Sequence, residues 1–151
     1  MDALTLLKED HERTMELMDQ IESLCDDDSQ ARKIFGQLKQ ALGLHSELEE
    51  KVFYPAISQF EETRDLVEES YRRHQEIDDL AADISRMSPH DEEFLDQVSE
   101  LREMIENHVS EEEDELFPEV EELLGKGRLE ELGRKIEQLA HRQAAAANKR
   151  K

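Results

Sequence analysis

The chain has 151 residues, of which 39% are charged and 5% aromatic, with 5 glycines, 3 prolines and no tryptophan. This composition favours helices over strands, which are rich in β-branched and aromatic residues, and the length suits one domain with a buried core. The formal charge of −21 argues against nucleic acid or an anionic membrane as a partner, because both would repel the chain.

From the sequence we expect neither a membrane span nor a secretory signal peptide. No apolar run approaches the roughly 20 residues that a membrane span needs, and the first residues, MDALTLLKED, lack the basic start and apolar core of a signal peptide. The single cysteine, Cys25, excludes an internal disulfide and is consistent with a reducing compartment. We therefore expect a cytoplasmic protein.

The first two predicted helices cover residues 4–25 and about 30–55. Their inward-facing positions recur at steps of three and four, which is the spacing of a helix stripe in a bundle. In the first helix these positions are Leu4, Leu7, His11, Thr14, Met18, Ile21 and Cys25, the last expected in the core at the end of the bundle. In the second they are Ile34, Leu38, Ala41, His45, Leu48 and Val52. Pro55 is expected to kink or end the second helix, because proline lacks the backbone N–H.

Two more long helices and a short one follow. The third, at about residues 65–87, repeats the first at an offset of 63 residues, and the fourth is expected to start at Ser88 and Pro89 and to continue to about Pro118. After the sequence GKGR at 125–128, an amphipathic segment predicts a fifth helix across the bundle. We therefore predict an all-α fold, an up-down-up-down four-helix bundle with a short fifth C-terminal helix, over residues 1–141. The basic tail, residues 142–151, is expected to be disordered.

One duplicated pattern of histidines and glutamates runs through these helices. A histidine followed four residues later by a glutamate occurs twice at the offset of 63, which also relates two further histidines. The six residues are His11, His45, Glu49, His74, His108 and Glu112. A histidine and a glutamate four apart project from one helix face about one turn apart, and four neighbouring helices can aim such side chains at the bundle axis.

Four imidazoles and two carboxylates are more than one tetrahedral zinc ion needs. The pattern therefore predicts two metal ions bridged by Glu49 and Glu112, and this donor set suits non-haem iron. A single histidine on an apolar stripe is more often a core residue than a ligand, but four in one duplicated pattern favour metal binding. The two remaining histidines, His90 and His141, lie outside the pattern and are predicted not to be ligands.

On these residues the chain resembles the hemerythrin-like (HHE) cation-binding domain, whose pattern is His, His-x-x-x-Glu, His, His-x-x-x-Glu around a di-iron centre. The resemblance covers about residues 4–118 and implies two iron ions with a bridging oxo or hydroxo group, held by the six residues. Oxygen-carrying hemerythrins have a further histidine where this chain has Asp78, and they end with His-x-x-x-x-Asp. These departures disfavour reversible O2 carriage and make Asp78 a candidate additional ligand.

The helical phase of three neighbouring side chains predicts where they point. Tyr71, three residues before His74, and Glu111, three after His108, are candidates to hydrogen-bond the ligands. Tyr54 follows His45 by nine residues, about 900° around an α-helix, and is predicted to point away from the site.

Two classes of function stay open at this stage. One is an enzyme that converts a small oxygen or nitrogen species in oxidative or nitrosative stress, as in catalase-like breakdown of H2O2, because an open ligand position admits peroxide. The other is a non-catalytic sensor, carrier or store for O2, NO or iron, since no nucleophile elbow or phosphate-binding loop is evident. A metal-free helical interaction protein is a third interpretation. The small-molecule partner is thus O2, H2O2 or NO, and the sequence makes no prediction of the oligomeric state.

Overall fold

The structure is a computed structural model, and it describes residues 1–24 and 27–149. All secondary structure in these two ranges is helical, and no strand occurs in them. The elements are α1 (Ala3–Ser23), α2 (Asp28–Leu48), η1 (Glu49–Phe53), α3 (Tyr54–Ile57), α4 (Glu61–Ser85), α5 (Glu92–Ser110), η2 (Glu111–Leu116) and α6 (Phe117–Lys149). The segments η1 and η2 are π-helical. The expectation for Cys25 lies outside the described residues.

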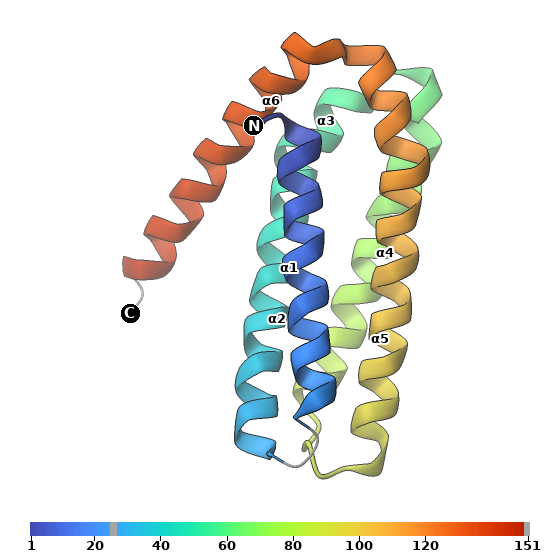
Figure 1. The fold of residues 1–151 in the computed structure, drawn as a ribbon. Coiled ribbons are helices and arrows are strands. Elements are labelled where there is room, and N and C mark those ends of the chain that lie inside the picture. Colours follow the sequence, from blue (N-terminus) through green and yellow to red (C-terminus); the bar gives the residue numbers. More distant parts are fainter. Residues whose placement is uncertain (25–26, 150–151) are drawn as a thin grey trace.

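The four long helices α1, α2, α4 and α5 lie side by side, and successive ones run in opposite directions (Figure 1). Short connections allow this, because a brief loop returns the chain next to the helix it has just left. The predicted all-α four-helix bundle is confirmed.

Local capping explains where the first two helices begin. The carboxylate of Asp2 accepts a 2.8 Å hydrogen bond from the backbone N–H of Thr5, and Asp27 accepts a 3.1 Å bond from that of Gln30. Each bond satisfies one of the free N–H groups at a helix start.

The start predicted for the fourth helix was wrong. The α5 helix begins at Glu92, and residues 88–91 form a turn in which the N–H of Asp91 donates to the carbonyl of Ser88 at 2.9 Å. Proline is favoured at the second position of such a turn because its φ is already fixed near the required value. Pro89 therefore shapes the turn before the helix.

The core consists of two apolar clusters, one on each side of the histidines. One contains Leu7 and Leu48, and the other contains Met18 and Leu38. His11 lies between Leu7 and Met18 along α1, so the predicted ligands occupy the middle of the bundle.

The inward face of α2 differs from the prediction. Phe35 and Leu42 are buried, whereas Ile34 and Ala41 are only partly buried. Both sets fit a helical period, and the larger apolar area of Phe35 and Leu42 favours turning those residues inward.

Pro55 does not end the helix. It widens into the π-turn η1 and continues through Pro55 to Ile57, with the N–H of Tyr54 bonded to the carbonyl of Glu49. A proline clashes with the carbonyl four residues earlier in an α-helix. The wider turn separates these groups, because π-bonding joins residues five apart.

The helix α6 contains the predicted fifth helix as its second half. A sharp bend at Gly125, whose φ is 76°, divides it, and the second half then descends beside the N-terminal part of the bundle (Figure 1). Leu129, Leu132 and Ile136 are buried there, as their spacing predicted. Helix continues to Lys149, so residues 142–149 differ from the disordered tail that we predicted. The run QAAAA explains this, because alanine has the highest helix propensity.

Within residues 1–24 and 27–149, every helix is either too short or too polar to cross a lipid bilayer.

Candidate metal centre

The structure gathers the six residues of the duplicated pattern into one buried cluster. The side chains of Glu49 and Glu112 are completely buried, and each of the four histidines is at most 8% exposed. Buried carboxylates require charged or hydrogen-bonding partners. The arrangement of their partners therefore indicates what the cluster can hold.

Glu49 lies at the centre of three histidines. Its Oε1 atom is 3.0 Å from Nε2 of His74 and 3.2 Å from Nε2 of His45. Nε2 of His108 is 3.9 Å from the same oxygen. One carboxylate oxygen thus faces nitrogen atoms from both halves of the molecule, as a bridging ligand requires.

Glu112 occupies the corresponding position in the second half of the chain. Its Oε1 atom is 3.1 Å from Nε2 of His11 and 3.5 Å from Nε2 of His108. The four Nε2 atoms therefore point to a common interior space, together with both carboxylates.

The outward-facing nitrogens of three histidines bind further carboxylates, which the sequence analysis missed. Nδ1 of His11 is 2.6 Å from Glu113 Oε2, and Nδ1 of His74 is 2.8 Å from Glu50 Oε2.

Nδ1 of His45 is likewise 2.9 Å from Asp10 Oδ2. A carboxylate at Nδ1 fixes that nitrogen as the N–H donor, leaves Nε2 as the inward lone pair and orients the ring. The three acids thus prepare their histidines to bind a cation.

Tyr54 corrects another prediction, since it points into the site. Its hydroxyl donates a 2.6 Å hydrogen bond to Oε2 of Glu112 and lies 3.3 Å from Nε2 of His74. An α-helix would have turned it to the opposite side, but η1 accommodates about one extra residue, which rotates the following residues back by roughly 100°. The π-turn therefore places a phenol at the cluster.

The structure places Asp78 and Tyr71 away from the cluster. Asp78 is exposed on α4 and belongs to neither group of converging ligand atoms. Tyr71 is 39% exposed and packs its ring edge-on against Tyr54, with centroids 5.2 Å apart.

Glu111 and the two other histidines also lie elsewhere. Glu111 accepts a 3.3 Å hydrogen bond from Arg73 on the surface of the bundle. His90 pairs with Asp28 at the end of the bundle where α2 and α5 begin, and His141 is exposed on α6. The ligand roles of the six buried residues stay a prediction.

The buried carboxylates of the cluster raise the pKa values of the histidines that they contact. Burial alone would lower the pKa of His74, but its hydrogen bond to Glu49 and the charge of that carboxylate, together with Glu50, raise the pKa to about 9. Burial would also lower the pKa of His45, yet Glu49 and Asp10 raise it well above its ordinary value. In the absence of cations, His45 and His74 therefore hold protons that offset the charge of the buried carboxylates, and bound metal ions would take over this role.

The two central carboxylates differ from each other. Burial and the nearby charge of Glu49 raise the pKa of Glu112, whereas His45 outweighs the effect of burial on Glu49 and holds its pKa well below the ordinary value. Burial together with the charge of Glu49 raises the pKa of Tyr54 well above 10, so its hydroxyl keeps its proton. Of the two glutamates, Glu112 therefore takes up a proton more readily than Glu49, and a bound cation would displace that proton.

The donor atoms fit two cations. The side chains of His11, His45, Glu49 and Glu112 offer atoms that lie within 4.8 Å of one another, and a second such group, comprising His74, His108 and Glu49, shares one carboxylate with the first. Among the described residues, buried Nε2 of His45, Oε2 of Glu49 and Nδ1 of His108 lack hydrogen-bond partners. A metal ion would bind Oε2 of Glu49 directly, and it would bind Nε2 of His45 once that imidazole has released its proton.

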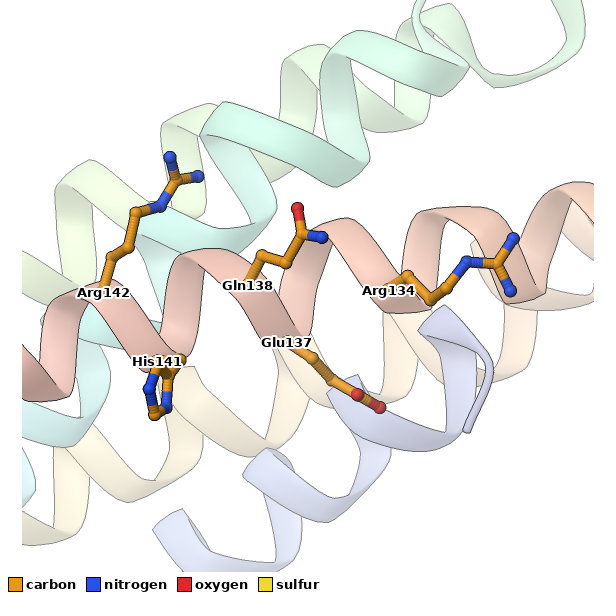
Figure 2. Close-up of a pocket in the computed structure, with 5 residues that line it drawn as sticks. All are labelled: Arg134, Glu137, Gln138, His141 and Arg142. Atoms are coloured by element: carbon orange, nitrogen blue, oxygen red, sulfur yellow. The ribbon is translucent and has the colours of Figure 1, made fainter.

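The cavity next to the cluster is very small. It has a volume of about 20 Å³ and is lined by the four histidines and by apolar side chains that include Leu42, Ile77 and Ile105. A groove of about 280 Å³, between α6 and the α1–α2 pair, shares Thr14 and His45 with it. A further hollow of about 680 Å³ lies on α6 between Arg134 and Arg142, and none of its lining residues belongs to the cluster (Figure 2).

Cation-binding proteins commonly build their metal sites from histidines and glutamates in the core of a helical bundle, and this fold and cluster match that class. The family model for the hemerythrin HHE cation-binding domain matches residues 2–120, and the chain belongs to this family. The predicted family is therefore confirmed.

The chain is similar to a solved structure and to a second protein by sequence. A crystal structure of a hemerythrin HHE cation-binding domain-containing protein from Mycobacterium kansasii matches with a TM-score of 0.85 and 24% identity, over 97% of this chain and 90% of that one. A protein from Nostoc sp. named DNA nickase is 29% identical over 131 residues, which are 87% of this chain. The match covers 37% of that relative, so the chain spans little more than a third of its length.

Proposed function

We propose that the cluster holds two iron ions and that the protein binds or converts a small oxygen or nitrogen species there. The donor set supports iron, because imidazoles and carboxylates with a vacant position suit non-haem iron. A bridging oxo or hydroxo group between the ions, as the family resemblance implies, is part of the same proposal.

The small cavity is the observation that carries the proposal. A volume of about 20 Å³ next to four histidines is enough for one water-sized molecule. Larger organic substrates do not fit. The molecules of the right size are O2, NO and H2O2, and the groove that shares Thr14 and His45 with the cavity is the approach that we assign to them.

We favour catalase-like breakdown of hydrogen peroxide in the oxidative stress response. One molecule of peroxide is then oxidised to O2 and releases two protons and two electrons, and a second takes them up to give two molecules of water. Bound iron would carry the electrons between them. Proton transfer falls to the chain itself. Tyr54 keeps its phenolic proton and donates it in a hydrogen bond to Glu112, so this pair can hold or pass a proton beside the site.

Metal analysis and an activity assay test the proposal together. Protein purified without added metal should contain close to two irons per chain and should release O2 when peroxide is added. Iron without O2 release would favour the alternative of a sensor, carrier or store, for which the exclusion of larger substrates is equally suitable. Zinc, or no bound metal, would contradict the di-iron proposal.

The nicking of DNA is not part of the proposal. That activity is named for a relative of which this chain covers 37%. The formal charge of −21 opposes contact with a polyanionic phosphate backbone.

A further inference from the structure

The offset of 63 residues relates the predicted ligands to one another, and it also relates some of the side chains that contact them. Glu50 and Glu113 are separated by this offset, and each binds Nδ1 of the corresponding histidine, His74 or His11. The supporting carboxylates of these two histidines are therefore equivalent in the two halves.

The other pair of histidines breaks this equivalence. Asp10 accepts the hydrogen bond from Nδ1 of His45, and 63 residues after Asp10 stands Arg73. A guanidinium has no acceptor atom. Within the described part of the chain, Nδ1 of His108 has no hydrogen-bond partner. Arg73 instead reaches Glu111 at 3.3 Å and Glu69 at 3.2 Å.

We propose that this substitution makes the two metal positions unequal. The position formed by His11 and His45 binds its ion first, and the position formed by His74 and His108 binds more weakly and exchanges its ion. Asp10 and Arg73 act as positioning residues that set the difference. The inference rests on the proposed function, since it requires that the cluster binds metal.

The physical reason is the basicity and orientation of the ligand. A carboxylate at Nδ1 raises the electron density on Nε2 and fixes the ring, and loss of such a partner costs about 10–100-fold in metal affinity. His108 lacks this support, while His45 has it. The cationic Arg73 in place of the anionic Asp10 acts in the same direction, because it disfavours a second cation.

Zinc titration of the metal-free protein tests the order of filling. Zn²⁺ is diamagnetic, so the side-chain nitrogen resonances of each histidine can be followed by NMR. At one Zn²⁺ per chain, His11 and His45 should show the signals of bound imidazoles, and His74 and His108 should still show those of the free form. Simultaneous filling, or filling of His74 and His108 first, would overturn the inference.

A substitution at Arg73 separates the effect of the missing acceptor at Nδ1 of His108 from the repulsion between the two bound cations. Arg73→Asp should tighten the second binding step about 10–100-fold by supplying the missing acceptor. Arg72→Asp is the matched control, because it makes the same change of charge on the exposed neighbour, which pairs with Glu69. It should alter the second step roughly threefold or less. Equal effects of the two variants would contradict the role of Arg73.

Asp10 gives an independent test if Arg73→Asp does not fold. Asp10→Asn should weaken the first binding step, and Asp10→Glu should restore it in part. Unchanged binding in Asp10→Asn would overturn the inference. Failure of the wild-type protein to bind Zn²⁺ and Fe²⁺ at all would instead refute the proposed function, so the two failures are distinguishable.

Discussion

The metal-free protein should lose stability as the pH rises from about 6.5 to about 9, and His74 should be a main cause. Its pKa is raised from 6.5 to about 9 in the folded state, chiefly by Glu49 against the opposing effect of burial. A group whose folded pKa lies above its unfolded pKa stabilises fully below the unfolded value. This stabilisation is lost as the pH rises through the folded value.

The size of the effect follows from the same two values. A shift from 6.5 to about 9 is worth up to ~3 kcal/mol. For a domain of about 150 residues, one kcal/mol changes the melting temperature by about 2–4 °C. His74 alone should therefore lower the melting temperature by roughly 10 °C across this range. The pKa values of His11 and His45 are raised as well, so their contributions have the same sign.

Thermal unfolding followed by circular dichroism, in the presence of a chelator, measures this loss between pH 6 and pH 9.5. His74→Asn should flatten the pH dependence, whereas His141→Asn, a change at an exposed histidine on α6, should leave it as in the wild type. A melting temperature that is constant or rises over this range would refute the reasoning. The same pH dependence of the melting temperature in His74→Asn and His141→Asn would also refute it.

Two further pairs of substitutions test the hydrogen bond of Tyr54 and the packing of α6. Tyr54→Phe removes the donor to buried Glu112 and should cost about 1–3 kcal/mol in chemical denaturation, while Tyr71→Phe, at a ring that is 39% exposed, should cost far less. Equal losses would argue against the hydrogen bond. Gly133→Ala should lower the melting temperature, because its new Cβ would collide with the carbonyl of the N-terminal residue and displace α6. Gly127→Ala has open space and should gain up to about 1 kcal/mol from helix propensity, so a gain in both would contradict this packing.

Much of the cluster was predictable because it follows from helical periodicity. Residues four apart share a face in an α-helix, so the spacing between His45 and Glu49 fixed their proximity. The duplication then implied that His108 and Glu112 would form a matching pair. The structure brings all of these side chains together, with Glu49 and Glu112 completely buried.

The position of Tyr54 was not predictable from an α-helical phase. The π-turn η1 changes the rotation per residue between His45 and Tyr54, and a sequence period near 3.6 carries no sign of it. The signals available in the sequence were two prolines, Pro55 and Pro118. They are related by the offset of 63 residues, and each closely follows a π-turn.

The supporting carboxylates could have been found from the sequence. Glu50 follows Glu49 directly, and the equivalent Glu113 follows Glu112, so the duplication extends one residue beyond the predicted ligands. Asp10 gave a weaker signal, because its counterpart at the offset of 63 is an arginine. Contacts between helices decide which acids reach a histidine, and these contacts cannot be inferred from the spacing of residues along one helix.

The iron content of the purified chain, measured for the wild type and for Glu49→Ala and Glu112→Ala, tests the central claim most directly. We expect close to two irons per wild-type chain. Iron content should fall in each variant because each glutamate faces histidines of both halves. The melting temperature should fall as well, because a metal ion that binds only the folded state stabilises it. Unchanged iron in the variants would contradict the bridging role of the glutamates, and a wild-type chain without iron would contradict the di-iron centre itself.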